Sequence, residues 1–152
     1  MEDPISKPPP SHGCVVVTGA AGFIGRHLVR QLLDAGHAVR AVTRDPDQLR
    51  RNWPDGWPAE STAPALQLVR HPGVDAGADW QPLLAGAVAV VHGAGIAHVP
   101  LDANRNSQRQ LWRVNVRGPR QLALAAARAG VKQMIFLSSI KAAGEWSTPG
   151  HP

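Results

Sequence analysis

Apolar residues fall into five short runs separated by polar and turn-forming residues. Short, largely β-branched runs are typical of strands buried on both faces of a sheet. The predicted strands are Cys14–Val17, Ala38–Thr43, Ala65–Val69, Ala87–His92 and Gln133–Leu137. Helical spacing of apolar residues follows between them. The predicted helices are His27–Leu33, Trp80–Leu84 and about Asn106–Ala129, with a helical turn near Asp47–Arg51 inside a long loop, Arg44–Pro64.

This alternation of strands and helices predicts an α/β fold. Right-handed crossovers then give a Rossmann-type doubly wound parallel sheet of strand order 3-2-1-4-5, in three layers, α/β/α. Such a sheet binds its ligand at the carboxyl ends of the strands where the order reverses, here the first and the fourth. Gly19–Gly25 and His92–Ile96 both fall at that edge.

The segment after the first strand reads Thr18-Gly-Ala-Ala-Gly-Phe-Ile-Gly25. A strand, a glycine turn and a helix in this order hold the diphosphate of a dinucleotide, although the spacing is a variant of the G-x-G-x-x-G fingerprint. We expect Gly19 to form the tight turn, Gly22 to admit a phosphate and Gly25 to bring helix and strand together. The predicted cofactor-binding residues of this loop are Gly19, Ala21, Gly22, Phe23, Ile24 and Gly25.

Composition narrows the classes of function. The 152 residues fit one domain, and the single cysteine, Cys14, excludes an internal disulfide, which suits the cytoplasm. No apolar run approaches the ~20 residues of a membrane span. The net charge of +5 comes from arginines spread along the chain, so we predict no nucleic acid partner. The seven histidines lack metal-ligand spacing, so no metal site is predicted.

The glycine segment and three further segments occur in the order typical of one family: Thr18–Gly25, Val90–Gly95, Val114–Gly118 and Leu137–Glu145. Over about residues 14–150 the chain resembles the extended short-chain dehydrogenase/reductases, the NAD-dependent epimerase/dehydratase family that acts on nucleotide sugars. The Ser-Ser-Ile-Lys-x-x-Gly-Glu segment looks like the branch that makes polysaccharide precursors. The resemblance implies an NAD(P)-binding Rossmann domain over 14–145, whose cofactor site also includes Gly93, Ala94, Gly95 and Leu137.

The resemblance assigns catalytic roles to two residues. Ser139, five residues before Gly144, matches the serine that binds the reacting sugar hydroxyl; the alternative is a serine that only ends a strand. Asn115 matches the helix asparagine whose main chain helps to position the catalytic lysine. Pro119, four residues later, has no N–H, which should free the Asn115 carbonyl. A surface asparagine beside a proline kink is the alternative.

Cofactor choice depends on the end of the second strand, where an acid binds the ribose hydroxyls of NAD and an arginine accepts the 2′-phosphate of NADP. The chain has Thr43-Arg44-Asp45 there, which leans slightly towards NADP over NAD. Alternatively, Arg44 stacks on adenine or faces solvent. After the third strand the family often has Gly-Asp-Leu, whereas this chain has His71-Pro-Gly-Val-Asp75, with the acid displaced.

Arg105, Arg109, Arg113 and Arg117 recur every four residues along the long predicted helix. We read them as a solvated helix face. The alternative is a subunit interface, because members of the family often pair through helices here, and it would make the protein a homodimer.

The family's Tyr-x-x-x-Lys pair is missing, since the sequence contains no tyrosine. The last residues, 146–152, are then expected to be the start of a truncated substrate region. Before them we expect a disordered proline-rich tail over 1–13 and the binding domain over 14–145. The predicted function is the NAD(P)-binding portion of a nucleotide-sugar epimerase, dehydratase or reductase, inactive alone. A non-catalytic NAD(P)-sensing or scaffolding module of the same fold is the alternative.

Overall fold

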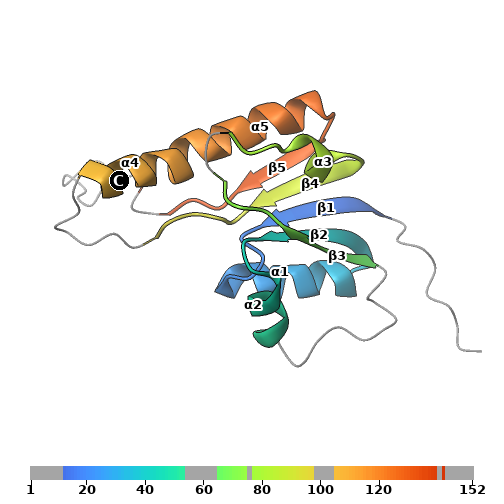
Figure 1. The fold of residues 1–152 in the computed structure, drawn as a ribbon. Helices are drawn as coiled ribbons and strands as arrows, with labels where there is room; N and C mark the ends of the chain where they lie inside the picture. Colours follow the sequence, from blue (N-terminus) through green and yellow to red (C-terminus); the bar gives the residue numbers. More distant parts are fainter. Residues whose placement is uncertain (1–11, 54–64, 75–76, 98–104, 140–141, 143–152) are drawn as a thin grey trace, which may run out of the picture.

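The computed structural model describes residues 12–53, 65–74, 77–97, 105–139 and 142. A five-stranded parallel sheet forms its centre, in the order β3-β2-β1-β4-β5 (Figure 1), which confirms the predicted fold and strand order. The strands are β1 (His12–Thr18), β2 (His37–Thr43), β3 (Leu66–Arg70), β4 (Ala87–His92) and β5 (Gln133–Phe136).

The helices cover both faces of the sheet (Figure 1). They are α1 (Phe23–Asp34), α2 (Pro46–Arg51), α3 (Gln81–Leu84), α4 (Arg105–Trp112) and α5 (Gly118–Arg128), with a π-helical turn η2 (Arg113–Arg117) joining the last two. In the described part of the chain, no helix is long and apolar enough to cross a membrane.

The first strand begins earlier than predicted. His12 already pairs in parallel with His37, and the register shifts between His12 and Cys14, so Gly13 lies at an irregularity in the strand. The predicted tail over 1–13 therefore overlaps β1 at His12 and Gly13. Residues 1–11 lie outside the described residues, as do 146–152.

The long helix predicted over 106–129 is interrupted at η2. Pro119 has no N–H to donate to the Asn115 carbonyl four residues before it. The N–H of Gly118 instead donates to the Arg113 carbonyl, five residues back, which is the hydrogen bond of a π turn. The proline therefore widens the helix locally, over the single π turn η2. The helix axis is not broken there, and α4 and α5 follow one line in Figure 1.

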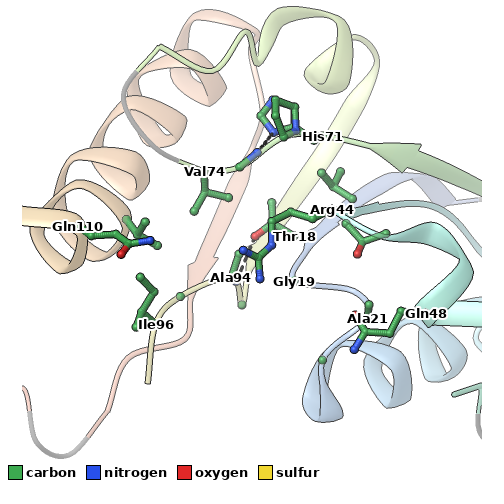
Figure 2. Close-up of a pocket in the computed structure, with 18 residues that line it drawn as sticks. Thr18, Gly19, Ala21, Arg44, Gln48, His71, Val74, Ala94, Ile96 and Gln110 are labelled. Carbon is green, nitrogen blue, oxygen red and sulfur yellow. Dashed lines mark hydrogen bonds between the residues drawn. The ribbon is translucent and has the colours of Figure 1, made fainter. Parts of the chain in front are cut away.

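The carboxyl ends of β1 and β4 lie side by side, with Thr18 opposite His92. The glycine loop leaves one strand there and the segment 93–97 leaves the other. Figure 2 shows this edge from close by, with Thr18, Gly19 and Ala94 next to one another. The site predicted at the reversal of strand order therefore has both of its expected segments in place.

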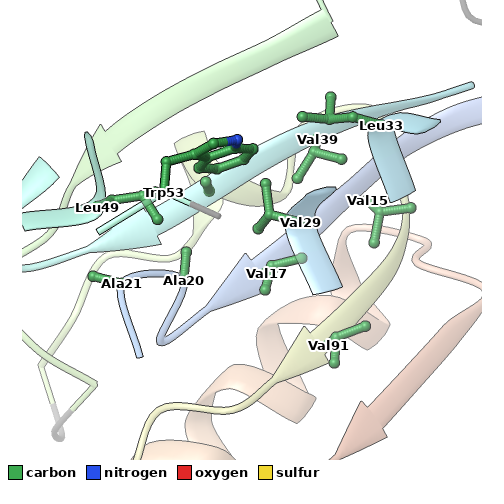
Figure 3. Packing of buried hydrophobic residues seen from close by; sticks show 11 residues of the cluster. Val15, Val17, Ala20, Ala21, Val29, Leu33, Val39, Leu49, Trp53 and Val91 are labelled. Atoms are coloured by element: carbon green, nitrogen blue, oxygen red, sulfur yellow. The ribbon is translucent and has the colours of Figure 1, made fainter. Parts of the chain in front are cut away.

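Alternating side chains of β1 supply two cores. Val15 and Val17 join α1, α2 and Trp53 on one face, shown in Figure 3. Val16 joins α3 and α5 on the other face, together with the fully buried Leu122. Both faces of the central strand are covered, as the unbroken apolar run of β1 predicts for a parallel sheet. This packing holds the ends of β1 and β4 in fixed positions.

Candidate cofactor site

The three glycines of the loop meet different surroundings. Gly19 has φ +71°, and a Cβ there would lie 2.7 Å from the Ala94 nitrogen. A Cβ on Gly25 would collide with the Gly19 carbonyl and lie 2.8 Å from Ala20 Cα. A Cβ on Gly22 would meet only the Gly19 carbonyl oxygen, at 3.2 Å. Gly19 and Gly25 therefore permit packing of the loop itself, whereas Gly22 leaves space open beside it.

The amino end of α1 begins at this open position. Gly22 is its N-cap, no side chain caps it, and its first turn has no acidic residue. The first N–H groups of a helix have no partner within the helix, and its dipole favours an anion at this end. A 12-residue helix with this end uncapped is suited to hold a phosphate group.

A cavity of about 430 Å³ opens beside the loop. In Figure 2, Ala21 and Gln48 lie on one side of it and Ile96 and Gln110 on the other. Its lining draws on the ends of β1, β2, β3 and β4 and on the α4–η2 helix. The lining residues are Thr18, Gly19, Ala21, Gly22, Val42, Thr43, Arg44, Gln48, His71, Pro72, Gly73, Val74, Gly93, Ala94, Gly95, Ile96, Gln110 and Val114.

Eight residues predicted to bind the cofactor line this cavity: Gly19, Ala21, Gly22, Thr43, Arg44, Gly93, Ala94 and Gly95. Four others do not. Phe23 and Ile24 are exposed on the first turn of α1, Gly25 lies behind the loop against Gly19, and Leu137 follows β5, where it is exposed. Ser139 is exposed and does not line the cavity either; its carbonyl accepts a hydrogen bond from the Ala142 N–H at 2.9 Å.

Sequence reasoning missed several wall residues, among them Gln48, Gln110 and Val114. Gln48 lies four residues after Arg44, in the helical turn predicted near Asp47–Arg51. Gln110 and Val114 lie four residues apart on a helix, so their spacing places them on one side of it. Nothing in that spacing shows that the side faces a cavity rather than solvent.

A buried hydrogen-bond network joins the two segments that leave β1 and β4. The Thr18 hydroxyl oxygen lies 2.6 Å from His92 Nδ1 and accepts a hydrogen bond from the Ala94 N–H at 3.3 Å. The hydroxyl has a second lone pair and a proton of its own, so its bond to Nδ1 forms with either tautomer of His92. The Thr18 carbonyl also accepts from the Gly93 N–H at 3.2 Å. Thr18 therefore fixes the start of both loops.

His92 itself is fully buried, and its ring stacks on Phe136 at 5.6 Å between centroids. Burial removes water from the imidazole and lowers the pKa of His92 to about 4. The ring is therefore neutral near pH 7. Among the described residues, its Nε2 has no hydrogen-bond partner.

Asn115 holds the segment after β4 through its side chain. Its Nδ2 donates to the Ile96 carbonyl and its Oδ1 accepts from the Ile96 N–H, both at 2.9 Å. A Cβ on Gly95 would lie 3.3 Å from the same Oδ1. The prediction for Asn115 concerned only its main chain, whereas the structure shows a paired side-chain contact that ties η2 to the cavity wall.

At the end of β2, Arg44 and Asp45 have different surroundings. Arg44 lines the cavity. Asp45 is the N-cap of α2: its carboxylate accepts from the Asp47 N–H at 3.0 Å and the Gln48 N–H at 3.2 Å. Chiefly because of the Gln48 N–H, the pKa of Asp45 is below its usual value. Asp45 therefore has a structural role that Arg44 does not share.

The wall after β3 carries His71, whose ring stacks on Trp80 at 4.7 Å between centroids. Its Nδ1 accepts a hydrogen bond from the Gly73 N–H at 3.3 Å. Asp75, the displaced acid of the segment after the third strand, lies outside the described residues. Among the described residues, no group of three or more His, Cys, Asp or Glu side chains is placed to hold a metal ion.

Comparison with known proteins agrees with this geometry. The family model described as NAD dependent epimerase/dehydratase family matches residues 15–151. The chain belongs to this family. It is 40% identical over 136 residues to the chloroplastic divinyl chlorophyllide a 8-vinyl-reductase of Oryza sativa subsp. indica. This alignment covers 86% of this chain and 31% of the reductase. It is 32% identical over 139 residues to the UDP-glucose 4-epimerase of Vibrio cholerae, covering 91% and 38%.

Solved structures of similar proteins show the same fold. MoeE5 in complex with UDP-glucose and NAD aligns with a TM-score of 0.68 at 30% identity, over 89% of this chain and 39% of MoeE5. Uronate dehydrogenase from Agrobacterium tumefaciens aligns with a TM-score of 0.59 at 28% identity, over 83% and 40%. The chain thus spans about a third of the length of the relatives that it matches in sequence.

Proposed function

We propose that this chain is the nicotinamide-dinucleotide-binding unit of an enzyme that acts on a nucleotide sugar by epimerisation, dehydration or reduction. The observation that carries this is the uncapped end of α1, which begins at Gly22 on the wall of the cavity. The diphosphate would lie at this end, with the adenosine towards Thr43 and Arg44 and the nicotinamide towards Gly93–Gly95. When bound, the nicotinamide supplies the hydride chemistry.

We further propose that NADP is preferred over NAD. The acid expected to bind the ribose hydroxyls, Asp45, already accepts two N–H groups of α2 and lies 3.5 Å from Arg51. Arg44 lines the cavity, where its guanidinium can pair with a 2′-phosphate. Structural neighbours such as MoeE5 are solved with NAD, which supports the cofactor class.

The nucleotide-sugar substrate is proposed from the neighbours that are complexed with one. MoeE5 is solved with UDP-glucose, and a UDP-glucuronic acid 4-epimerase from Bacillus cereus, 25% identical, with a fluorinated UDP-glucuronic acid. In such an enzyme Ser139 would orient the sugar hydroxyl and Asn115 would fix the cavity wall beside the nicotinamide. The cytoplasmic location and the homodimer stay predictions.

The 152 residues hold no tyrosine, and we propose that the proton transfer that accompanies hydride transfer uses a group from outside them. We expect this chain to bind NADPH and to show no turnover alone. The same lack of tyrosine favours one alternative, a unit that binds NAD(P) only to sense or to scaffold. Epimerase, dehydratase or reductase turnover by the chain alone would contradict both proposals.

Titration calorimetry of the 152-residue chain with NADPH and NADH tests the binding. Gly22→Val should abolish binding while the protein stays folded, because the new side chain fills the phosphate space and has only one close neighbour within the loop, at 3.2 Å. Gln31→Val, exposed on the same helix, is the matched control. A folded wild-type chain that binds neither nucleotide would refute the proposal.

The cofactor preference is tested separately. Arg44→Gln should weaken NADPH binding by roughly tenfold or more and leave NADH binding unchanged, because only NADP carries the 2′-phosphate. Arg50→Gln on α2 removes the same charge outside the cavity and should leave both affinities unchanged. Equal losses for the two nucleotides in Arg44→Gln would contradict a 2′-phosphate site.

A further inference from the structure

The carboxyl ends of β2 and β3 lie side by side at one end of the cavity, and each brings an arginine there. Thr43 of β2 is the parallel partner of Arg70, the last residue of β3. Arg44 follows Thr43 directly and lines the cavity. The Nη1 group of Arg70 donates a hydrogen bond to the Arg44 carbonyl at 3.2 Å. The Arg70 guanidinium therefore lies against the backbone of the residue proposed to bind the 2′-phosphate.

The side chain of Arg70 lies on the face of the sheet that α2 covers. Leu68 packs against the core that contains Leu49 of α2. Residues two apart on a strand share a face, so Arg70 is on the same face as Leu68. The Gln48 N–H chiefly, and the charge of Arg70 to a smaller extent, lower the pKa of Asp45, the N-cap of α2. Arg70 is therefore close to both the turn after β2 and the start of α2.

The positive charge of these two strand ends is not neutralised by the chain itself. The acids of α2 and of the turn before it are each paired with an arginine of α2: Asp47 with Arg50 at 2.8 Å, and Asp45 with Arg51 at 3.5 Å. In the part of the chain that the structure describes, neither Arg44 nor Arg70 has a carboxylate within ion-pair distance. The nearby acids are thus already compensated, and two arginines are not.

The hydrogen-bonding capacity of Arg70 is also largely unused. A guanidinium has five N–H donors, and the structure gives Arg70 a single hydrogen bond among the described residues. The planar fork of an arginine matches the oxygens of a phosphate, which it binds with two parallel hydrogen bonds. A phosphate monoester carries nearly two negative charges near pH 7. Two unpaired arginines at adjacent strand ends therefore suit this group in both charge and donors.

We propose that Arg70 is a second specificity-determining residue for the cofactor, and that it binds the 2′-phosphate of NADP together with Arg44. This inference rests on the proposed cofactor function. Arg44 would approach the phosphate from the wall of the cavity, and Arg70 from the end of β3. NAD carries no phosphate at this position, so both guanidinium groups would stay without an anionic partner.

A positioning role is the alternative for Arg70. Its hydrogen bond to the Arg44 carbonyl would then fix the backbone of Arg44, and only Arg44 would contact the phosphate. The two roles differ in a variant that lacks the Arg44 guanidinium. A direct contact of Arg70 with the phosphate still contributes there, whereas a role that acts through Arg44 does not.

Titration calorimetry with adenosine 2′,5′-bisphosphate and adenosine 5′-monophosphate tests the proposal, because the two probes differ only in the 2′-phosphate. Arg70→Gln should weaken binding of the bisphosphate by roughly tenfold and leave that of the monophosphate unchanged. In the Arg44→Gln background, Arg70→Gln should weaken binding of the bisphosphate by a further factor of about three or more. Arg50→Gln, which removes the same charge from α2, should change neither affinity. Urea unfolding of each variant checks that it is folded.

Several results would overturn the proposal and leave the proposed cofactor function in place. An unchanged affinity of Arg70→Gln for the bisphosphate would exclude the contact, and equal losses for both probes would exclude a 2′-phosphate role. An equal loss in Arg50→Gln would show that only net charge matters. No further loss in the Arg44→Gln background would make Arg70 a positioning residue. By contrast, a folded wild-type chain that binds neither NADPH nor NADH would contradict the cofactor function itself.

Discussion

Replacement of Thr18 by valine removes one hydroxyl from the centre of the site and leaves its shape almost unchanged. That hydroxyl is hydrogen-bonded to His92 Nδ1 at 2.6 Å and accepts from the Ala94 N–H at 3.3 Å. Thr18 and His92 are both fully buried, so water cannot replace the lost partner. We expect Thr18→Val to destabilise the fold and to loosen the contact between the loops that follow β1 and β4.

The magnitude follows from the two groups that lose their partner. A buried polar group left unsatisfied costs about 1–3 kcal/mol, and the longer bond to Ala94 belongs at the lower end, so the sum is about 3 kcal/mol. The added methyl group of valine returns up to about 0.8 kcal/mol. The net loss in the free energy of unfolding is therefore about 2 kcal/mol, a large part of the 5–15 kcal/mol typical of a domain.

Urea unfolding followed by tryptophan fluorescence measures this loss, since the chain has five tryptophans. Thr18→Ser is the matched control, because it keeps the hydroxyl and removes only a methyl group, at about 1 kcal/mol. The double variant Thr18→Val/His92→Phe closes a double-mutant cycle and isolates the hydroxyl–imidazole contact. A Thr18→Val protein within about 0.5 kcal/mol of the wild type would refute the assignment of the network.

The remaining predictions concern the pH dependence of stability, the paired contact of Asn115 with Ile96, and the packing of α5. Burial lowers the pKa of His92 to about 4 in the folded protein, against 6.5 in the unfolded chain. As the pH falls, the unfolded chain therefore binds a proton at His92 before the folded protein does. The free energy of unfolding should fall by up to about 3 kcal/mol between pH 6.5 and 4 for this reason. Unfolding curves at several pH values measure this fall, and the contribution of His92 to it should be absent in His92→Gln. Asn115→Ala removes both hydrogen bonds to Ile96, so it should lower the free energy of unfolding in urea by about 2 kcal/mol and weaken nucleotide binding. A loss below about 0.5 kcal/mol would show that this contact does not hold the cavity wall. Leu122→Ala should cost about 3 kcal/mol, because the side chain is fully buried, whereas Leu124→Ala on the same helix, 43% exposed, should cost much less; equal losses would contradict the packing of α5 on the sheet.

The sheet was predictable because each strand satisfies a simple local rule. The run Cys14–Val17 is apolar without a break, and the structure uses Val15 and Val17 on one face and Val16 on the other. The order of strands follows from crossover handedness, which does not depend on individual side chains. Element ends were less predictable: α1 begins at Phe23, directly after the last loop turn, although apolar periodicity is clear only from His27.

The candidate site was predictable where backbone geometry decides it and not where side chains choose partners. Gly19 and Gly25 mark the loop because only glycine tolerates the turn and the close contacts at these two positions. The roles of Asn115 and Asp45 depend on which N–H lies within reach, and this follows from the tertiary structure. Asp45 beside Arg44 left the choice of cofactor almost balanced in sequence, and the helix cap formed by Asp45 is what separates the two residues.

The glycine loop also shows why its motif alone is a weak guide to ligand binding. Gly19 permits contact with the segment after β4, and Gly25 permits contact between α1 and the loop, so both are needed for folding with or without a cofactor. Only Gly22 adds space that the folded chain does not itself fill. Folding alone therefore requires two of the three glycines, whereas the third is required only for phosphate binding. Nucleotide titration of Gly22→Val therefore separates the two explanations more sharply than substitution of Gly19 or Gly25, which would disturb the fold and the site together.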